Sequence, residues 1–271
     1  MPIQFTDHYK DYNGGSHFSV TNEEPFLHAY LLDKYTGGKT FQKAGVIASG
    51  GEIPLLAIAP VCDSVVAIDH NYGSLAFAAA KILLLETLGP RELYERMLYA
   101  HERGLVVALF ASVSKDLPDV LRPHFDKVLS DYYSCSTLRK YWSYFPLAMI
   151  ERAAAHCHKI HLVHGDFNDL VEFGAPFDLL YVSNATSTSH YPRGSKNSGY
   201  GAGGLKPNFK TLATDGCIVI HTAGDREPHV ALKECEPLGP SVSSTQDMTW
   251  HYHLLRYSAK SAELKKTKKA A

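Results

Sequence analysis

Short apolar runs recur along this chain, separated by longer stretches in which apolar residues return with helical spacing. Runs of four to eight residues that are rich in β-branched and aliphatic side chains predict buried strands. Five such runs are AGVIA at 44–48, SVVAID at 64–69, KIHLVHG at 159–165, FDLLYVSN at 177–184 and GCIVIHT at 216–222. A sixth stretch, 248–259, alternates between apolar and polar residues and predicts a terminal antiparallel strand.

The clearest helix covers residues 72–89, where Ala and Leu dominate and Gly89 stands at the position of a C-cap. A shorter helix is predicted after Gly51, opening with Glu52 and carrying Pro54 in its first turn. Residues 90–155 have a helical but irregular pattern, with PRELYERMLYAHERG and STLRKYWSYFPLAMIERAAAHC as the clearest helices. The order strand, helix, strand, helix, helical insert and three strands is typical of a doubly wound α/β fold with a mostly parallel sheet.

Three parts follow from this order. Residues 1–42 form an N-terminal segment that we expect to cover the ligand site. Residues 43–259 form the α/β domain, with the helical insertion at about 90–155 before the third strand. Residues 260–271 are a Lys-rich tail, which is expected to be solvated and disordered.

Composition narrows the class of protein. The 271 residues carry a net charge of −1, so no overall field attracts nucleic acid or an anionic membrane. The five cysteines form no C-x-x-C pair, which indicates reduced thiols in a cytoplasmic protein. No signal peptide and no apolar run of membrane-spanning length is visible, so we expect no membrane insertion.

Two glycines and an acid mark the first candidate site. Gly50 and Gly51 follow the first strand, and Asp69 ends the second strand twenty residues after Ser49. Glycines at that turn let the backbone approach a ligand closely, and an acid at the second strand end can bind both hydroxyls of a ribose. The alternative is a plain tight turn and a strand-end Asp. The pattern is not G-x-G-x-x-G, so no pyrophosphate site is implied.

The next strand ends carry polar groups as well. Asp166 follows the third strand, where its carboxylate could accept from an adenine amino group while the Phe167 amide meets a ring nitrogen. Ser183 and Asn184 close the fourth strand, where a substrate would lie. Polar groups at the carboxyl ends of four apolar strands favour a shared ligand site.

The strand order and these motifs resemble the class I S-adenosylmethionine-dependent methyltransferase fold, which has a seven-stranded sheet. More narrowly, they resemble the 3-amino-3-carboxypropyltransferases of betaine-lipid synthesis. The residues that carry this resemblance are ASGG at 48–51, AIDHN at 67–71, VHGDFNDL at 163–170 and DGCIVIHTA at 215–223. It extends over roughly residues 44–223, at the level of pattern.

The resemblance implies roles for individual residues. Ser49, Gly50 and Gly51 would line the methionine part of S-adenosylmethionine, and Asp69 would hold its ribose. His70 would flank the adenine, whose edge Asp166 and Phe167 would read. Where the family usually has Cys-Asn-Ala after the glycines, this chain has Glu52-Ile53-Pro54. It also lacks an interfacial Lys-rich helix, so a small soluble acceptor is expected rather than diacylglycerol.

The resulting hypothesis is an enzyme with S-adenosylmethionine as cosubstrate and no metal. Reaction at the aminocarboxypropyl chain would release methylthioadenosine, either by transfer to a small acceptor or by cyclisation to azetidine-2-carboxylate. Two alternatives stay open: methyl transfer to a small molecule, and a catalytically inactive cofactor-binding subunit. The expected partner is a small-molecule substrate, and a homo-oligomer is left open.

Candidates for the catalytic roles are Asn184, Tyr181 and Tyr12, with Ser183 as a further polar contact to the ligand. A tyrosine face could stabilise the sulfonium by cation–π contact, although a packing tyrosine is the commoner case. The loop at 185–209 is long enough to be a lid and holds candidate side chains. The remaining candidates are Tyr9, Tyr191, Tyr200, Arg193 and Lys196.

Histidines are clustered at 156–164, but their facing disagrees between helix and strand, so no metal site is expected. His251 and His253 share one face of the terminal strand, which favours a pair on the surface.

Overall fold

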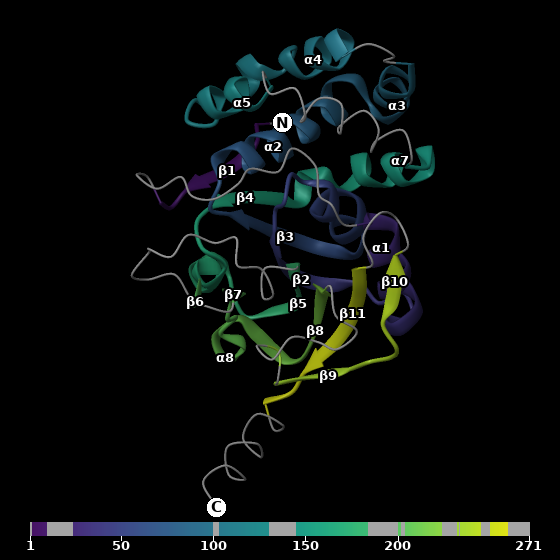
Figure 1. The fold of residues 1–271 in the computed structure, drawn as a ribbon, viewed down its shortest axis with the longest axis vertical. Coiled ribbons are helices and arrows are strands. Elements are labelled where there is room, and N and C mark those ends of the chain that lie inside the picture. Colours follow the sequence, from purple (N-terminus) through teal and green to yellow (C-terminus); the bar gives the residue numbers. More distant parts are fainter. Residues whose placement is uncertain are drawn as a thin grey trace, which may run out of the picture. The chain divides into compact units, whose positions relative to one another are not determined.

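The computed structural model describes residues 2–9, 24–99, 103–129, 145–183, 200–201, 204–223, 232, 234–244 and 250–259. By its internal packing the chain divides into two compact units. The first unit comprises residues 1–25, 48–60 and 67–165, and the second comprises residues 26–47, 61–66 and 166–271. Figure 1 labels the helices and strands of both units, with colours that follow the sequence from the N-terminus (purple) to the C-terminus (yellow).

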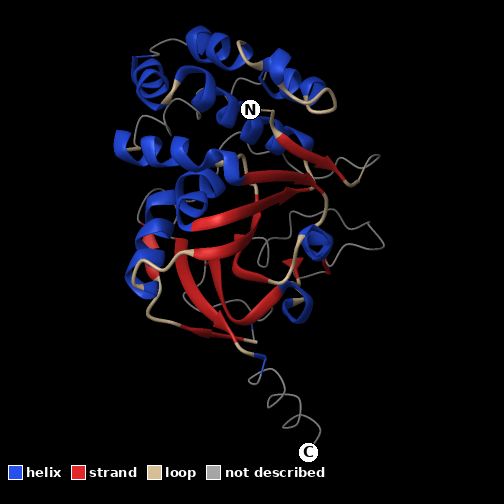
Figure 2. Cartoon of the chain, turned by 180° about the vertical axis from the view of Figure 1, so that it is seen from behind, coloured by secondary structure: helices blue, strands red, loops and turns tan. Residues whose placement is uncertain are grey.

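The first unit is mainly helical (Figure 2). Its strands have the order β1–β4–β3, and β1 runs parallel to β4 with Gln4 opposite His161. The strand bounds are β1 (Gln4–Asp7), β3 (Cys62–Asp69, of which 67–69 belong here) and β4 (Ile160–His164). The helices are η1 (Ile53–Ile58), η2 (Ala59–Val61), α2 (Tyr72–Leu88), α3 (Pro90–Tyr99), α4 (Arg103–Ala111), η3 (Ser114–Asp116), α5 (Arg122–Leu129), α7 (Leu147–His156) and η4 (Cys157–Lys159).

Helix α2 forms the centre of the first unit. Every residue from Tyr72 to Leu85 is buried, as expected for a helix that is apolar around its whole circumference. It packs against α3, α5 and α7 as well as against β4. Asn71 caps its first turn, accepting from the amides of Gly73 (2.8 Å) and Ser74 (3.2 Å), and Gly89 at φ +77° caps its end.

The second unit is built on strands. Their order is β3–β2–β5–β8–β11–β10, with β9 pairing a further part of β11. The strands are β2 (Phe41–Ile47), β5 (Phe177–Ser183), β8 (Ala213–Ala223), β9 (Cys235–Pro237), β10 (Val242–Ser244) and β11 (Trp250–Tyr257). The other elements are α1 (Pro25–Thr36), η5 (Phe167–Phe173), α8 (Phe209–Leu212) and the separate pair β6 (Tyr200–Gly201) and β7 (Gly204–Leu205).

This strand order identifies the doubly wound arrangement. β2, β5 and β8 are parallel, while β11 is antiparallel to β8, β9 and β10. From β2 the chain continues to β3 on one side and later to β5 on the other, so the order reverses between β2 and β5. A reversal of this kind is where open α/β sheets bind ligands, at the carboxyl ends of the strands.

The predicted fold class, α/β with a mostly parallel sheet, is confirmed. Each predicted strand is found within a few residues of its expected range, and α2 matches residues 72–89 at both caps. The strand count differs from the expected seven, since the described residues contribute nine strands to the sheet. Six of the nine correspond to the six segments predicted from the sequence. The other three, β1, β9 and β10, have three or four residues each, too few to show a periodic pattern.

Among the described residues, no single helix is long and apolar enough to cross a membrane. Helices α2 and α3 reach the length and apolar composition of a membrane-spanning segment only when taken together, and the two are bent by 113° at the break between them.

Candidate cofactor site

The turn after β2 forms the floor of the candidate site in the first unit. Its backbone has positive φ at three successive residues: Ser49 (+40°), Gly50 (+83°) and Gly51 (+106°). Side chains rarely adopt such values, and only Gly does so without steric cost. A Cβ on Gly51 would lie 2.8 Å from the Cα and 2.9 Å from the Cβ of Ala78 on α2. The second glycine is therefore fixed by contact with a helix.

Most polar backbone groups of this turn are already hydrogen-bonded. The Gly51 N–H donates to the Ala48 carbonyl (2.8 Å), and the Gly51 carbonyl accepts from the Leu55 N–H (3.0 Å). The Gly50 carbonyl accepts from Lys81 Nζ (2.6 Å). By contrast, no hydrogen bond joins the Ser49 carbonyl or the Gly50 N–H to any other residue that the structure describes. This one peptide offers an acceptor and a donor, although Gly50 is buried.

Asp69, at the end of β3, closes one side of the turn. Its Oδ2 accepts from the Ser49 N–H (3.2 Å) and its Oδ1 from the Asn71 N–H (3.0 Å). The side chain is 7% exposed, and burial raises the pKa of the Asp69 carboxyl above its usual range. Each carboxylate oxygen has a second lone pair, so two further donors would stabilise the ionised form. A vicinal diol supplies two donors at that spacing.

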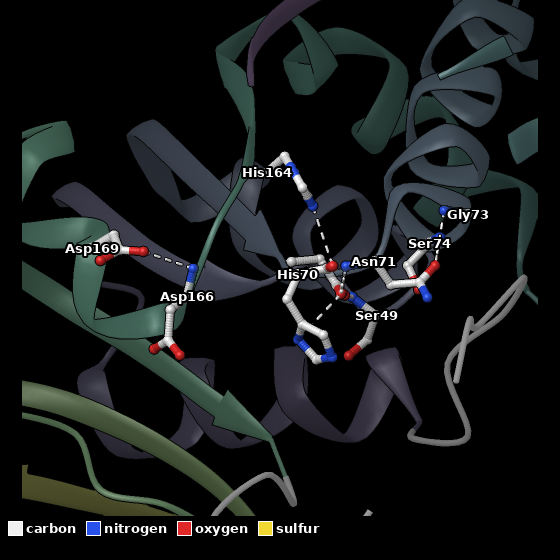
Figure 3. A network of polar contacts seen from close by, with 9 residues as sticks. Ser49, His70, Asn71, Gly73, Ser74, His164, Asp166 and Asp169 are labelled. Atoms are coloured by element: carbon white, nitrogen blue, oxygen red, sulfur yellow. Dashed lines mark hydrogen bonds and ion pairs between the residues drawn. The ribbon is translucent and has the colours of Figure 1, made fainter. Parts of the chain in front are cut away.

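His70 lies beside this carboxylate, with Nδ1 3.9 Å from Asp69 Oδ1. Burial lowers the pKa of the His70 ring, which favours a neutral imidazole at physiological pH. In Figure 3 the ring of His70 and the hydroxyl of Ser49 project to the same side of the backbone. A neutral aromatic ring at this position can pack against a flat heterocycle.

A second set of contacts holds the backbone of His70. His164 Nε2 lies 3.2 Å from the His70 carbonyl (Figure 3), and His164 Nδ1 lies 2.9 Å from Asp7 Oδ1. The Tyr72 hydroxyl donates to the same Asp7 oxygen (2.8 Å), and its ring stacks on His164 with centroids 3.7 Å apart. These contacts tie β1 to the strand end at Asp69, so the N-terminal strand helps to position the turn.

Asp166 and Phe167 belong to the second unit. The Asp166 carboxylate caps η5 by accepting from the Asn168 N–H (3.1 Å), and Asp169 completes a capping box by accepting from the Asp166 N–H (2.8 Å; Figure 3). Burial raises the pKa of Asp166 to about 6. The Phe167 ring is buried, while its amide stands in the first turn of η5. Their adenine-reading roles stay predictions.

The raised pKa of Asp166 has a consequence for stability. Because the folded state holds this proton more tightly than the unfolded chain, ionisation destabilises the fold as pH rises from about 4 to 6. Asn is as good an N-cap as Asp. We therefore expect Asp166→Asn to raise the free energy of unfolding at pH 7.5 by up to about 3 kcal/mol, with the gain fading at pH 4. Urea unfolding at both pH values would measure this, and an equal effect at both would contradict it.

The predicted catalytic residues are only partly described. Tyr181 is fully buried on β5, with its ring edge-on to His28 at 5.3 Å, and its hydroxyl has no hydrogen-bond partner among the described residues. Ser183 ends β5 at φ +53°, and its carbonyl lies 2.8 Å from His221 Nδ1. Asn184, Tyr12, Tyr191, Arg193, Lys196 and the side chain of Tyr200 lie outside the described residues. These roles stay predictions.

One expectation about histidines is wrong. His251 and His253 were expected on the surface, but they are only 6% and 5% exposed. The His253 ring stacks on His221 of the neighbouring strand, with ring centroids 5.9 Å apart, and His221 is fully buried as well, so this face of the sheet is covered at these residues. Within the described ranges, no three His, Cys, Asp or Glu residues are arranged to hold a metal ion.

No protein-family model matches the chain, and no curated protein matches it. Among solved structures, the rRNA methyltransferase AviRa from Streptomyces viridochromogenes is 15% identical, with 89% of this chain and 88% of that chain covered and a TM-score of 0.46. The N-methyltransferase NodS from Bradyrhizobium japonicum, solved with S-adenosylhomocysteine, is 10% identical over 88% of each chain, with a TM-score of 0.40. The putative methyltransferase YhhF from Escherichia coli is 11% identical over 89% and 92%, with a TM-score of 0.39. Likeness at this level carries no argument about the reaction.

Several residues of the site were not anticipated from the sequence. Lys81 and Glu52 are both fully buried and pair beneath the turn, and Asp7 reaches His164 from the N-terminal strand. The signal for Lys81 was present, since it is the one charge within the apolar run 75–85 of α2. A lone Lys in a helix that is otherwise apolar on every side requires a buried partner.

Proposed function

We propose that this protein is an S-adenosylmethionine-dependent transferase. The observation that carries the proposal is the Ser49–Gly50 peptide, whose carbonyl and N–H have no hydrogen-bond partner among the described residues. Beside it, the buried Asp69 carboxylate accepts from the Ser49 N–H, the amide that precedes this peptide. An α-amino acid has a matching pair of groups, because its ammonium donates and its carboxylate accepts. A ribose diol would in turn supply the two donors that Asp69 has capacity to accept. A ligand that carries both an α-amino acid and a ribose diol is an adenosyl amino acid.

The remaining groups fit the same ligand. His70 offers a neutral ring for packing against adenine, and the two glycines of the turn have no Cβ that would keep a ligand away from the backbone. When bound, S-adenosylmethionine supplies carbons made electrophilic by the sulfonium. The chain's residues named here bind and orient this ligand, and little acid–base machinery is needed because the leaving thioether is neutral.

Methyl transfer to a small molecule is the first candidate reaction. The methyl carbon is the least hindered of the three carbons on the sulfonium, so it demands only a nucleophile held in line. Reaction at the aminocarboxypropyl chain is the second candidate, supported by the sequence pattern ASGG at 48–51 and AIDHN at 67–71. The two reactions differ in which carbon is presented to the acceptor, and therefore in the nucleoside released.

Product analysis tests the proposal and separates these candidates. The purified protein is incubated with S-adenosylmethionine, alone and with a panel of small amines and alcohols, and the nucleosides are followed by mass spectrometry. We expect adenosylhomocysteine for methyl transfer. Methylthioadenosine would instead indicate aminocarboxypropyl transfer, or cyclisation if it forms without an acceptor and together with azetidine-2-carboxylate. Tight binding with neither product would support a cofactor-binding subunit, and no binding in calorimetry would overturn the proposal.

A further inference from the structure

A buried ion pair lies directly beneath the candidate cofactor turn. Lys81 Nζ of α2 lies 2.5 Å from Glu52 Oε1, and both side chains are 0% exposed. The same ammonium donates to the Gly50 carbonyl at 2.6 Å and lies 5.8 Å from the centre of the Phe77 ring. All four residues belong to the first unit. A fully buried Lys–Glu pair that also bonds a backbone carbonyl is an expensive arrangement to maintain, because both charges lose their hydration.

Such a pair is not needed for the stability of the fold. Replacing a buried ion pair by apolar side chains of similar volume is often neutral or stabilising. The pair instead fixes the orientation of the Gly50 carbonyl, which points towards α2 because it accepts a hydrogen bond from Lys81 Nζ. With that carbonyl fixed inward, the Gly51 N–H of the same peptide is bound to Ala48. The orientation of the preceding Ser49–Gly50 peptide is thereby set at both of its ends, since Asp69 holds the Ser49 N–H on the other side.

We infer that Lys81 and Glu52 are positioning residues that orient the Ser49–Gly50 peptide for the amino acid end of the ligand. The inference rests on the proposed function and deepens it. It separates the Ser49–Gly50 peptide, which would bind the amino acid end of the ligand, from Asp69, which would bind the ribose. Lys81 acts through the Gly50 carbonyl and does not touch the ligand. Glu52 holds the Lys81 side chain in place and opposes the effect of burial, which lowers the pKa of Lys81.

The test compares two ligands in one variant. In Glu52→Leu/Lys81→Met both charges are replaced by apolar side chains of similar size. We expect its melting temperature to remain within a few degrees of the wild-type value, while its affinity for S-adenosylhomocysteine in calorimetry falls at least tenfold. Its affinity for adenosine, which lacks the amino acid end, is expected to stay within twofold. A general loosening of the site would weaken both ligands alike.

A matched control removes an ion pair that does not contact the turn. Arg96 and Glu92 pair on the exposed side of α3 in the same unit, again at 2.5 Å, so Glu92→Leu/Arg96→Met is expected to leave both affinities unchanged. If the apolar double variant does not fold, Glu52→Gln/Lys81→Met keeps an amide of the original size at position 52, and the same selective loss is expected.

The outcomes separate the two hypotheses. If the wild-type protein binds neither ligand, the proposed function fails. If it binds both and the folded double variant binds them equally well, the proposed function stands, and the positioning role of Lys81 and Glu52 is overturned. Equal losses for S-adenosylhomocysteine and adenosine also overturn it, because the pair would then support the fold and not the peptide.

Discussion

Replacing Gly51 by alanine is expected to destabilise the fold by about 3–5 kcal/mol, because two costs coincide at this position. The residue has φ +106°, which a side chain rarely adopts. The added Cβ would also lie 2.8 Å from the Cα of Ala78, and a backbone atom in a buried helix cannot give way as a flexible side chain would. Either α2 or the turn must move, so S-adenosylhomocysteine binding should fall with stability. Urea unfolding monitored by circular dichroism measures the first effect.

Gly89→Ala is the matched control for backbone strain. Gly89 also has positive φ (+77°), but nothing lies within 4 Å of the Cβ that it would gain. We expect this variant to lose about 1–3 kcal/mol, the cost of the backbone conformation alone, because φ 77° and ψ 165° lie in a region that is nearly exclusive to glycine. If Gly51→Ala were no less stable than Gly89→Ala, the close contact with α2 would be refuted.

The second large effect is expected at Asp69. Asparagine in its place keeps the shape of the side chain but can accept at one oxygen only, so one of the two amide donors at Ser49 and Asn71 loses its acceptor. The variant also loses the carboxylate that would accept from both ribose hydroxyls. We expect affinity for adenosine to fall at least tenfold, which corresponds to about 1.4 kcal/mol.

A comparison of nucleosides makes the Asp69 prediction specific. Wild-type protein should bind adenosine more tightly than 2′,3′-dideoxyadenosine, whereas Asp69→Asn should bind the two with similar affinity. Asp63→Asn, on the exposed part of the same strand, should keep the wild-type preference. If the Asp69 variant still discriminated against the dideoxynucleoside, the carboxylate would not be the ribose ligand.

The strands and α2 could be predicted from the sequence because their physics is local. Parallel strands that are covered on both faces have continuous apolar sequences, and the C-terminal end of α2 is marked in the sequence by the capping residue Gly89. The positions of Gly50, Gly51 and Asp69 followed from the same order, since parallel strands end at one edge of a sheet. The four residues QFTD at 4–7 carry no such pattern, so β1 was not foreseen.

The polar contacts of the site could not be predicted because they join distant parts of the chain. Glu52 and Lys81 are 29 positions apart, and Asp7 meets His164 across 157. Alternation placed His251 and His253 on one face, but a period of two does not tell whether that face is covered. Coverage is a tertiary property, and this is why the expected surface pair proved to be buried.

Helix α2 has no side that faces solvent along Tyr72 to Leu85, and this limits how the sequence can drift over evolutionary time. A change at position 81 leaves a buried acid at position 52 without its counter-charge, so the two positions are expected to vary together in any lineage that keeps this turn. Position 78 is likewise tied to 51, because a larger side chain on either would fill the same space. Residues of the ligand turn are thus expected to covary with buried positions of α2. Aligned sequences of relatives could be searched directly for this covariation.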